Sequence, residues 1–150
     1  MKPSAFIIAA PTSDSGKSTI TIGLLRALSR QGYHVQPFKC GPDYIDPKLH
    51  KNASGVDSVN LDLFMQSEES VRTLFSSYQA PSDAAVVEGV MGLFDGYDRD
   101  RGSTAHLAEV LDLPIVLVLT PKSMAYSVAP LLYGIKHFRP ELNILGVIFN

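Results

Sequence analysis

The sequence predicts an α/β fold: a mostly parallel, doubly wound sheet with helices on both faces. Short, almost continuous apolar runs alternate along the chain with segments whose apolar residues recur at helical spacing. Several apolar runs end in polar, glycine-bearing segments, and parallel sheets bind ligands at the carboxyl ends of their strands. The 150 residues suit about one domain, and 45% hydrophobic residues suffice for a core.

The first elements follow from these patterns. Residues 4–10 are a nearly continuous apolar run, which is typical of a strand buried on both faces. Residues 17–30 form the first expected helix, which Gly32 is placed to end, and residues 34–40 form a second strand. Residues 41–60 are rich in Gly, Pro, Asp and Asn. We expect them to form a long loop, and loops of that length are often functional.

The middle of the chain continues the alternation. Residues 61–65 and 67–78 are expected to be helical, with Ser67 as the cap of the second of these helices. A third strand is expected at residues 83–87. The highly charged residues 97–102 are expected to be exposed and mobile.

The last elements complete the pattern β-α-β-α-β-α-β-α-β. We expect a short helix at residues 104–111, a strongly apolar strand at 114–119, a helix at 128–138 and a strand at 144–149. The sequence stops at Asn150, directly after a strand. We therefore expect it to be a fragment or one half of a larger protein.

Composition excludes several classes of function. A net charge of −2 with scattered Lys and Arg argues against a nucleic-acid partner. The first apolar run is too short for a signal peptide, and no apolar stretch approaches the roughly 20 residues of a membrane span. The single cysteine, Cys40, is interpreted as a buried or incidental thiol, consistent with a reducing compartment. We expect a cytoplasmic protein without a membrane partner.

Residues 9–19, AAPTSDSGKST, have the layout of a phosphate-binding loop between a strand and a helix. Small residues let backbone N–H groups approach a polyphosphate, Lys17 adds positive charge, and the Ser18 hydroxyl is suited to Mg²⁺. Pro11 departs from the consensus glycine, and Asp14 is expected to point away from the phosphates. The predicted nucleotide-binding residues within the loop are Thr12, Ser13, Ser15, Gly16, Lys17, Ser18 and Thr19.

Two further segments carry charged residues at expected strand ends. Glu88 is a candidate Mg²⁺ ligand opposite Ser18, and its alternative is an ordinary loop acid. Lys39 is a candidate to neutralise a transferring phosphoryl group, and its alternative is a solvated surface lysine. Asp43 and Asp46 are candidate site acids or turn-forming residues. Asp95, between glycines, is equally open to function and to turn chemistry.

The four histidines show no metal-ligand spacing. We expect most of them to be surface or packing residues. His50 is the one retained as a site candidate, because it ends the Asp-rich segment.

Three segments together resemble a known family: PTSDSGKST at residues 11–19, KCGPDYIDPKLH at residues 39–50 and VEGVMGLFDG at residues 87–96. They resemble the amino-terminal synthetase domain of cobyrinate a,c-diamide synthases, which are related to dethiobiotin synthetase and MinD among P-loop proteins. The resemblance spans essentially all 150 residues. Asp14 departs from it, because the family usually has glycine there.

The resemblance implies an ATP-dependent amidation of the a and c carboxylates of a corrinoid, cobyrinate or hydrogenobyrinate, through an acyl phosphate. It implies ATP and Mg²⁺ as cofactors, with Ser18, Asp43 and Glu88 as metal ligands. Lys17, Lys39, Asp46 and Asp95 would be catalytic, and Asn150 would contact adenine. Ammonia would come from a glutaminase domain, and no part of the 150 residues resembles such a domain. A homodimer is compatible with this scheme.

Three alternatives stay open. A MinD-like nucleotide-switched ATPase would carry a signature lysine early in the loop, where this chain has Thr12. Dethiobiotin synthetase fits residues 41–50 less well. An interaction module without turnover is favoured only by Pro11 and Asp14.

Overall fold

A computed structural model describes residues 4–150 of the chain. They form one six-stranded sheet in which every described strand pair is parallel, with the strand order β3-β2-β4-β1-β5-β6. The elements, in chain order, are β1 (Ser4–Ala9), α1 (Lys17–Arg30), β2 (Val35–Cys40), α2 (Asp46–Ser54), β3 (Val59–Leu61), α3 (Glu68–Gln79), β4 (Ala84–Glu88), α4 (Thr104–Leu111), β5 (Ile115–Leu119), α5 (Val128–Phe138) and β6 (Ile144–Phe149). The predicted α/β class is confirmed.

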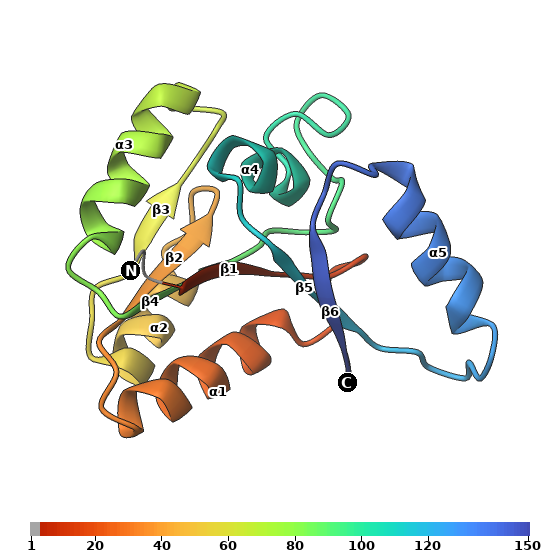
Figure 1. The fold of residues 1–150 in the computed structure, drawn as a ribbon, viewed down its shortest axis with the longest axis horizontal. Coiled ribbons are helices and arrows are strands. Elements are labelled where there is room, and N and C mark those ends of the chain that lie inside the picture. The colour runs from red at the N-terminus through yellow and green to blue at the C-terminus, as the bar shows by residue number, and fades with distance from the viewer. Residues whose placement is uncertain (1–3) are drawn as a thin grey trace.

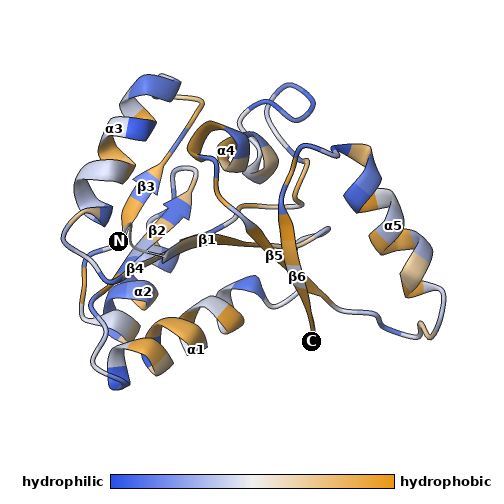
Figure 2. Cartoon of the chain, in the orientation of Figure 1, coloured by the Kyte–Doolittle hydropathy of each residue, from blue (hydrophilic) through white to orange (hydrophobic). Residues whose placement is uncertain are grey.

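Helices cover both faces of the sheet. In Figure 1, α1 and α2 lie below the sheet and α3 and α4 lie above it, while α5 stands to the right beside β6. One core cluster packs Leu25 of α1 and Ala53 of α2 against the strands, and the other packs α3 and α4 onto the opposite face through residues such as Phe75 and Leu107. Figure 2 shows β5 and β6 as hydrophobic along most of their length.

Most predicted elements are confirmed, and four helices or strands match the expected bounds: α1, α4, α5 and β6. The predicted cap of α3 is also confirmed, since the Ser67 hydroxyl accepts a hydrogen bond from the amide of Ser70. Among residues 4–150, no helix is long and apolar enough to cross a membrane.

The prediction of a continuous loop over residues 41–60 is wrong. Its second half contains α2 and the three-residue edge strand β3. Asp46 and Pro47 stand in the first turn of α2, and Gly55 ends it in the left-handed conformation. These residues are ordinary helix start and stop signals, which the turn-like composition of the segment concealed.

The predicted helix over residues 61–65 is also wrong. Leu61 belongs to β3, and the residues after it form a turn in which the Asp62 carboxylate accepts a hydrogen bond from the amide of Phe64. Strand pairing with β2 decided the state of Leu61, and such pairing is invisible in local periodicity.

Candidate functional site

The candidate site lies at the carboxyl edge of the sheet, beside the loop that follows β1. Parallel register places Lys39 of β2 opposite Glu88 of β4, and Glu88 opposite Ile8 of β1. Opposed residues of neighbouring strands point to the same face of the sheet, so Lys39 and Glu88 meet beside the amino end of α1. Two charged groups far apart in sequence are thus brought together by strand order.

A pocket of about 340 Å³ opens at this edge. Its walls come from the loop after β1, the start of α1 and the ends of β2 and β4, and they comprise Ser13, Asp14, Gly16, Lys17, Ser18, Thr19, Lys39, Glu88, Gly89 and Met91. A larger hollow of about 580 Å³ involves α3 and α4; Arg72 and Asp112 are its charged lining residues, and it contains neither the loop after β1 nor the ends of β2 and β4. The smaller pocket is therefore the chemical candidate.

The loop after β1 is held by its own side chains. The Ser15 hydroxyl donates to the carbonyl of Thr12 at 2.9 Å, and the two hydroxyls lie 3.0 Å apart. Gly16 has φ of +86°, and a Cβ there would lie 2.3 Å from the side-chain nitrogen of Asn150. Only glycine combines this backbone angle with so close a neighbour. Asp14 also has a positive φ, +59°, which Asp tolerates better than most residues.

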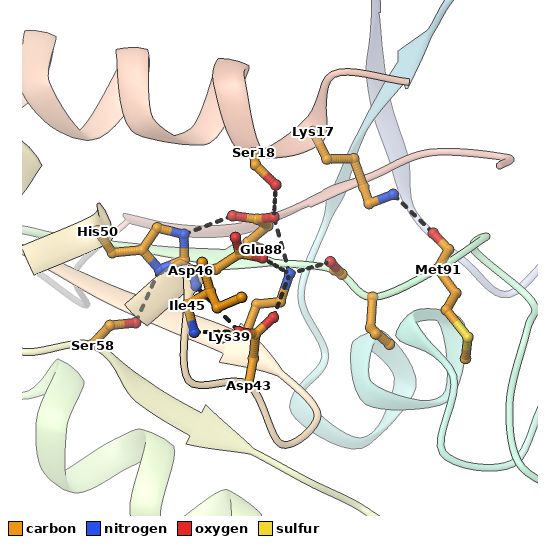
Figure 3. Close-up of polar contacts among 12 residues, drawn as sticks. Lys17, Ser18, Lys39, Asp43, Ile45, Asp46, His50, Ser58, Glu88 and Met91 are labelled. Carbon is orange, nitrogen blue, oxygen red and sulfur yellow. Dashed lines mark hydrogen bonds and ion pairs between the residues drawn. The ribbon is translucent and has the colours of Figure 1, made fainter. Parts of the chain in front are cut away.

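Lys17 lines the pocket and is 8% exposed. Its ammonium donates to the carbonyl of Met91 at 2.9 Å (Figure 3). It also donates to the carbonyl of Thr12 at 3.4 Å. Among residues 4–150, no carboxylate lies within 4.0 Å of it. Burial and the charge of Lys39 lower the pKa of Lys17. A nearly buried cation held only by neutral carbonyls suits an anionic ligand.

Glu88 is the centre of the polar cluster and is fully buried. Its Oε1 accepts hydrogen bonds from the Ser18 hydroxyl at 2.6 Å and from the Lys39 ammonium at 3.0 Å, while its Oε2 lies 2.6 Å from Nε2 of His50 (Figure 3). Burial opposes ionisation, but His50, Lys39 and Ser18 together lower the pKa of Glu88 to about 2. The group is therefore a carboxylate at neutral pH, and it is no ordinary loop acid.

Lys39 is 4% exposed, which excludes the solvated surface lysine. Its ammonium donates to Asp46 at 2.6 Å, to Glu88 and to the carbonyl of Gly89 at 3.2 Å. Burial alone would lower its pKa, but the charge of Glu88 and the hydrogen bond to Asp46 raise it. A buried ion pair with its hydrogen bonds satisfied in this way is expensive to break.

Asp43 and Asp46 lie at the start of α2 and serve partly as turn residues. The Asp43 carboxylate accepts hydrogen bonds from the amides of Ile45 and Asp46, and its other oxygen lies 3.9 Å from the Lys39 ammonium. Burial opposes the ionisation of Asp43, but the two amides lower its pKa overall. The pKa of Asp46 is raised, because burial and the charge of Glu88 both disfavour its ionised form. Both proposed roles, turn and site, are thus compatible with their placement.

Oxygen donors at the pocket fit a magnesium ion better than a softer metal. The hydroxyl of Ser18 and Oε1 of Glu88 are 2.6 Å apart on one wall. Mg²⁺ takes oxygen ligands and is commonly held by one or two protein groups together with substrate phosphates. Within residues 4–150, no group of three or more His, Cys, Asp or Glu side chains could hold a metal alone. Asp43, the third predicted ligand, has the Lys39 ammonium between it and Glu88.

Asp95 and Asn150 lie at the edges of this arrangement. The Asp95 carboxylate accepts a hydrogen bond from the amide of Gly92, and a Cβ on Gly92 would meet the carbonyl of Pro11 at 2.5 Å. Asp95 thus closes the turn that seats residues 89–96 against the loop after β1. The Asn150 amide donates to the carbonyl of Ser15 at 3.1 Å. Their assigned roles in catalysis and adenine contact stay predictions, as do those of Thr12, Ser13 and Thr19.

Sequence reasoning missed part of the cluster. It gave no role to the carbonyls of Gly89 and Met91 or to the hydroxyl of Ser58, which lies 3.0 Å from Nδ1 of His50. Backbone carbonyls leave no signal in a sequence. His50 itself is a site candidate from the sequence, because it ends the Asp-rich segment. What the sequence reasoning missed is that His50 stands four residues after Asp46 on one face of a helix, since the sequence predicts a loop in place of α2.

The profile of the CobQ/CobB/MinD/ParA nucleotide binding domain matches residues 6–150. The chain belongs to this family. The assignment agrees with the loop after β1, the lysine that opens α1 and the parallel sheet around them. A nucleotide-binding fold is therefore established for this chain.

Curated relatives are similar along the whole chain. Hydrogenobyrinate a,c-diamide synthase of Brucella anthropi is 51% identical over 147 residues, which is 97% of this chain and 34% of the relative. Cobyrinate a,c-diamide synthase of Picrophilus torridus is 47% identical over 152 residues, covering 100% of this chain and 34% of the relative. The chain thus spans about one third of the length of the curated relatives it matches.

Solved structures support the fold alone. The kinase domain of Escherichia coli tyrosine kinase ETK matches with a TM-score of 0.71 and 14% identity, over 100% of this chain and 68% of that one. The septum site-determining protein MinD of Pyrococcus horikoshii, complexed with Mg-ADP, matches with a TM-score of 0.58 and 17% identity, over 97% and 70%. The predicted MinD-like P-loop architecture is confirmed.

Proposed function

We propose that this chain is the ATP-binding synthetase part of an enzyme that amidates the a and c carboxylates of cobyrinate or hydrogenobyrinate. One observation carries the proposal: Lys17, Ser18, Lys39 and Glu88 line one pocket at the carboxyl edge of the sheet. Relatives that are 46–51% identical over nearly the whole chain bear the corresponding names, and they supply the substrate class.

The chemistry requires an activated carboxylate. A carboxylate is a poor acceptor for ammonia because oxide would have to leave; ATP supplies a phosphoryl group that turns that oxygen into a phosphate leaving group. A substrate carboxylate oxygen attacks the γ-phosphorus, ADP leaves, ammonia attacks the acyl carbon of the acyl phosphate and phosphate departs. The protein's contribution is positioning and charge neutralisation.

Each pocket residue has a place in that scheme. Among the residues that the structure describes, Lys17 is held only by the carbonyls of Thr12 and Met91 and would exchange them for phosphate oxygens. Ser18 and Glu88 would hold Mg²⁺, which fits their oxygen donors. Lys39, fixed by Glu88 and Asp46, keeps a positive charge beside the transferring group, while Asp43, Asp46 and Asp95 are assigned to orienting metal or substrate.

The proposal includes partners beyond the nucleotide. Ammonia would come from glutamine through a glutaminase domain, and the corrinoid would dock at the pocket's outer rim. The reaction is placed in the cytoplasm, without a nucleic-acid or membrane partner and with a homodimer as one form of assembly. These assignments rest on the names and lengths of the relatives and on the composition of the chain.

The test is an assay of the full-length protein with ATP, glutamine and cobyrinate, in which ADP release is followed with and without the corrinoid. The proposal predicts corrinoid-dependent ADP release and, when glutamine is omitted, an acyl phosphate that hydroxylamine traps as a hydroxamate. An equal rate of ADP release with and without the corrinoid would contradict the proposal. Such release stimulated by a protein partner would favour the MinD-like switch, whose fold this chain shares.

A further inference from the structure

A buried histidine is hydrogen-bonded to Glu88, the central carboxylate of the site. His50 is fully buried on α2, and its ring is hydrogen-bonded at both nitrogens, to Oε2 of Glu88 at 2.6 Å and to the hydroxyl of Ser58 at 3.0 Å. Figure 3 shows the His50 ring on the far side of Glu88 from Lys17, with Ser58 below the ring in that view. The three residues form a chain from the segment before β3 to the end of β4.

The two oxygens of Glu88 are divided between different neighbours. Oε2 lies against His50, while Oε1 faces Ser18 and Lys39. A carboxylate bonded on one side only could rotate about its last torsion, so the bond to Oε2 fixes the plane in which Oε1 is presented. Ser58 in turn fixes the ring, because its hydroxyl can donate to Nδ1 while Nε2–H donates to Glu88.

We propose that His50, oriented by Ser58, is a positioning residue that fixes the direction of Oε1 of Glu88, the oxygen that would hold Mg²⁺ together with the Ser18 hydroxyl. This role rests on the proposed Mg²⁺–nucleotide site. His50 itself touches neither ligand in this scheme, because Glu88 lies between it and Ser18. A merely structural histidine would stabilise the fold without affecting how nucleotide binding responds to Mg²⁺.

The test compares ATP binding by titration calorimetry, with Mg²⁺ and in EDTA, for His50→Ala, His50→Gln and Ser58→Ala. Groups that orient metal ligands typically contribute 10–100-fold to metal affinity, so His50→Ala should reduce the Mg²⁺-dependent gain in ATP affinity about tenfold. Metal-free affinity should stay within about twofold. Mn²⁺ titration followed by electron paramagnetic resonance gives a second readout, in which the same variant should bind nucleotide-dependent Mn²⁺ more weakly.

Rescue separates positioning from folding. His50→Gln keeps an N–H donor near the position of Nε2 and should recover most of the Mg²⁺ response, whereas Ser58→Ala leaves the Glu88 contact in place and should lose only about two- to threefold. His137→Ala, an exposed histidine on α5, is the matched control and should bind like the wild type. Thermal unfolding of each variant reports stability independently; if His50→Ala does not fold, Ser58→Ala and His50→Gln decide.

The outcomes distinguish this inference from the proposed function. Suppose that the wild type binds ATP more tightly in Mg²⁺ than in EDTA. The positioning role alone would then be overturned if His50→Ala keeps the same Mg²⁺-dependent gain in ATP affinity, or if it loses equal affinity in Mg²⁺ and in EDTA. A folded His50→Gln without any recovery would overturn it too. A wild-type chain that binds no ATP under either condition would overturn the proposed function, and the positioning role with it.

Discussion

At the scale of single residues, the two site lysines differ in what surrounds them. Lys39 is enclosed by carboxylates, whereas the ammonium of Lys17 contacts only backbone carbonyls. Removing Lys39 would leave Glu88 and Asp46 with uncompensated charge, so its effect on activity would be mixed with an effect on stability. Lys17 is the cleaner probe of ligand binding.

Lys17→Ala should abolish measurable ATP binding or weaken it by about 10- to 100-fold, because a hydrogen bond to a charged group contributes roughly 1.5–3 kcal/mol. Titration calorimetry measures this directly. Lys136→Ala removes an exposed lysine from α5 and should leave the affinity unchanged. Equal affinities in both variants would remove Lys17 from the nucleotide site.

Glu88→Gln removes the charge while keeping the shape of the side chain. We expect ATP binding in Mg²⁺ to weaken about tenfold or more, with a much smaller loss in EDTA, because the amide is a poor Mg²⁺ ligand. Glu69→Gln, on the exposed face of α3, is the control. If binding falls equally with and without Mg²⁺, Glu88 does not belong to the metal site.

At the scale of elements, the amino-terminal ends of three helices carry residues of the site or residues that stabilise the helix. The amino end of α1 carries the pocket, α2 begins at Asp46, and α3 begins at a serine that caps it. In α2, Asp46 contacts Lys39, and His50 contacts Glu88 directly, so this one helix positions groups on two sides of the Lys39–Glu88 pair. The start of α2 is therefore tied to the site, whereas the Ser67 cap of α3 contributes to stability alone.

Ser67→Ala should destabilise the protein by about 1 kcal/mol, because the Ser70 amide loses its acceptor. For a domain of this size that loss lowers the melting temperature by roughly 2–4 °C, as measured by circular dichroism. Ser67→Asp should retain most of the stability, since Asp caps equally well. Ser77→Ala, later in the same helix, should cost less, and a larger loss there would contradict the capping argument.

At the scale of the whole molecule, stability reflects how completely the two cores exclude water. Cys40, at the end of β2, is 2% exposed and belongs to the core on the α3 and α4 face. Burial is the main cause that raises the pKa of its thiol to about 11. The thiol is thus packed as a small apolar group, which supports a structural role for it.

The raised pKa of Cys40 makes stability depend on alkaline pH. Unfolded chains lose the thiol proton near pH 9 and the native state near 11, so its contribution is intact below pH 9 and is lost as pH rises toward 11. Urea unfolding measures the free energy of unfolding at pH 8 and at pH 10.5. Between these two pH values it should fall by on the order of 1–2 kcal/mol more in the wild type than in Cys40→Val. Parallel declines would contradict a buried thiol, as would rapid alkylation by iodoacetamide in the native state.

The sequence by itself determined the class of fold, most strands and helices, and the phosphate-binding loop. These features depend on local patterns: apolar runs, helical periodicity, and a Gly-Lys-Ser segment between a strand and a helix. It also marked Lys39, Asp46 and Glu88 as candidates, because polar residues at strand ends of a parallel sheet meet at one edge. Local pattern failed at residues 46–65, where tertiary pairing and a concealed helix decided the state.

Only the tertiary structure decided how those candidates contact one another. Strand order places β2 and β4 side by side, although 43 residues separate Cys40 from Ala84, and this pairing brings Lys39 to Glu88. The same packing buries His50 against Glu88 and leaves Lys17 bonded to the carbonyls of Thr12 and Met91. Contacts of this kind depend on register and burial across the sheet, and neither is encoded in any local stretch of the chain.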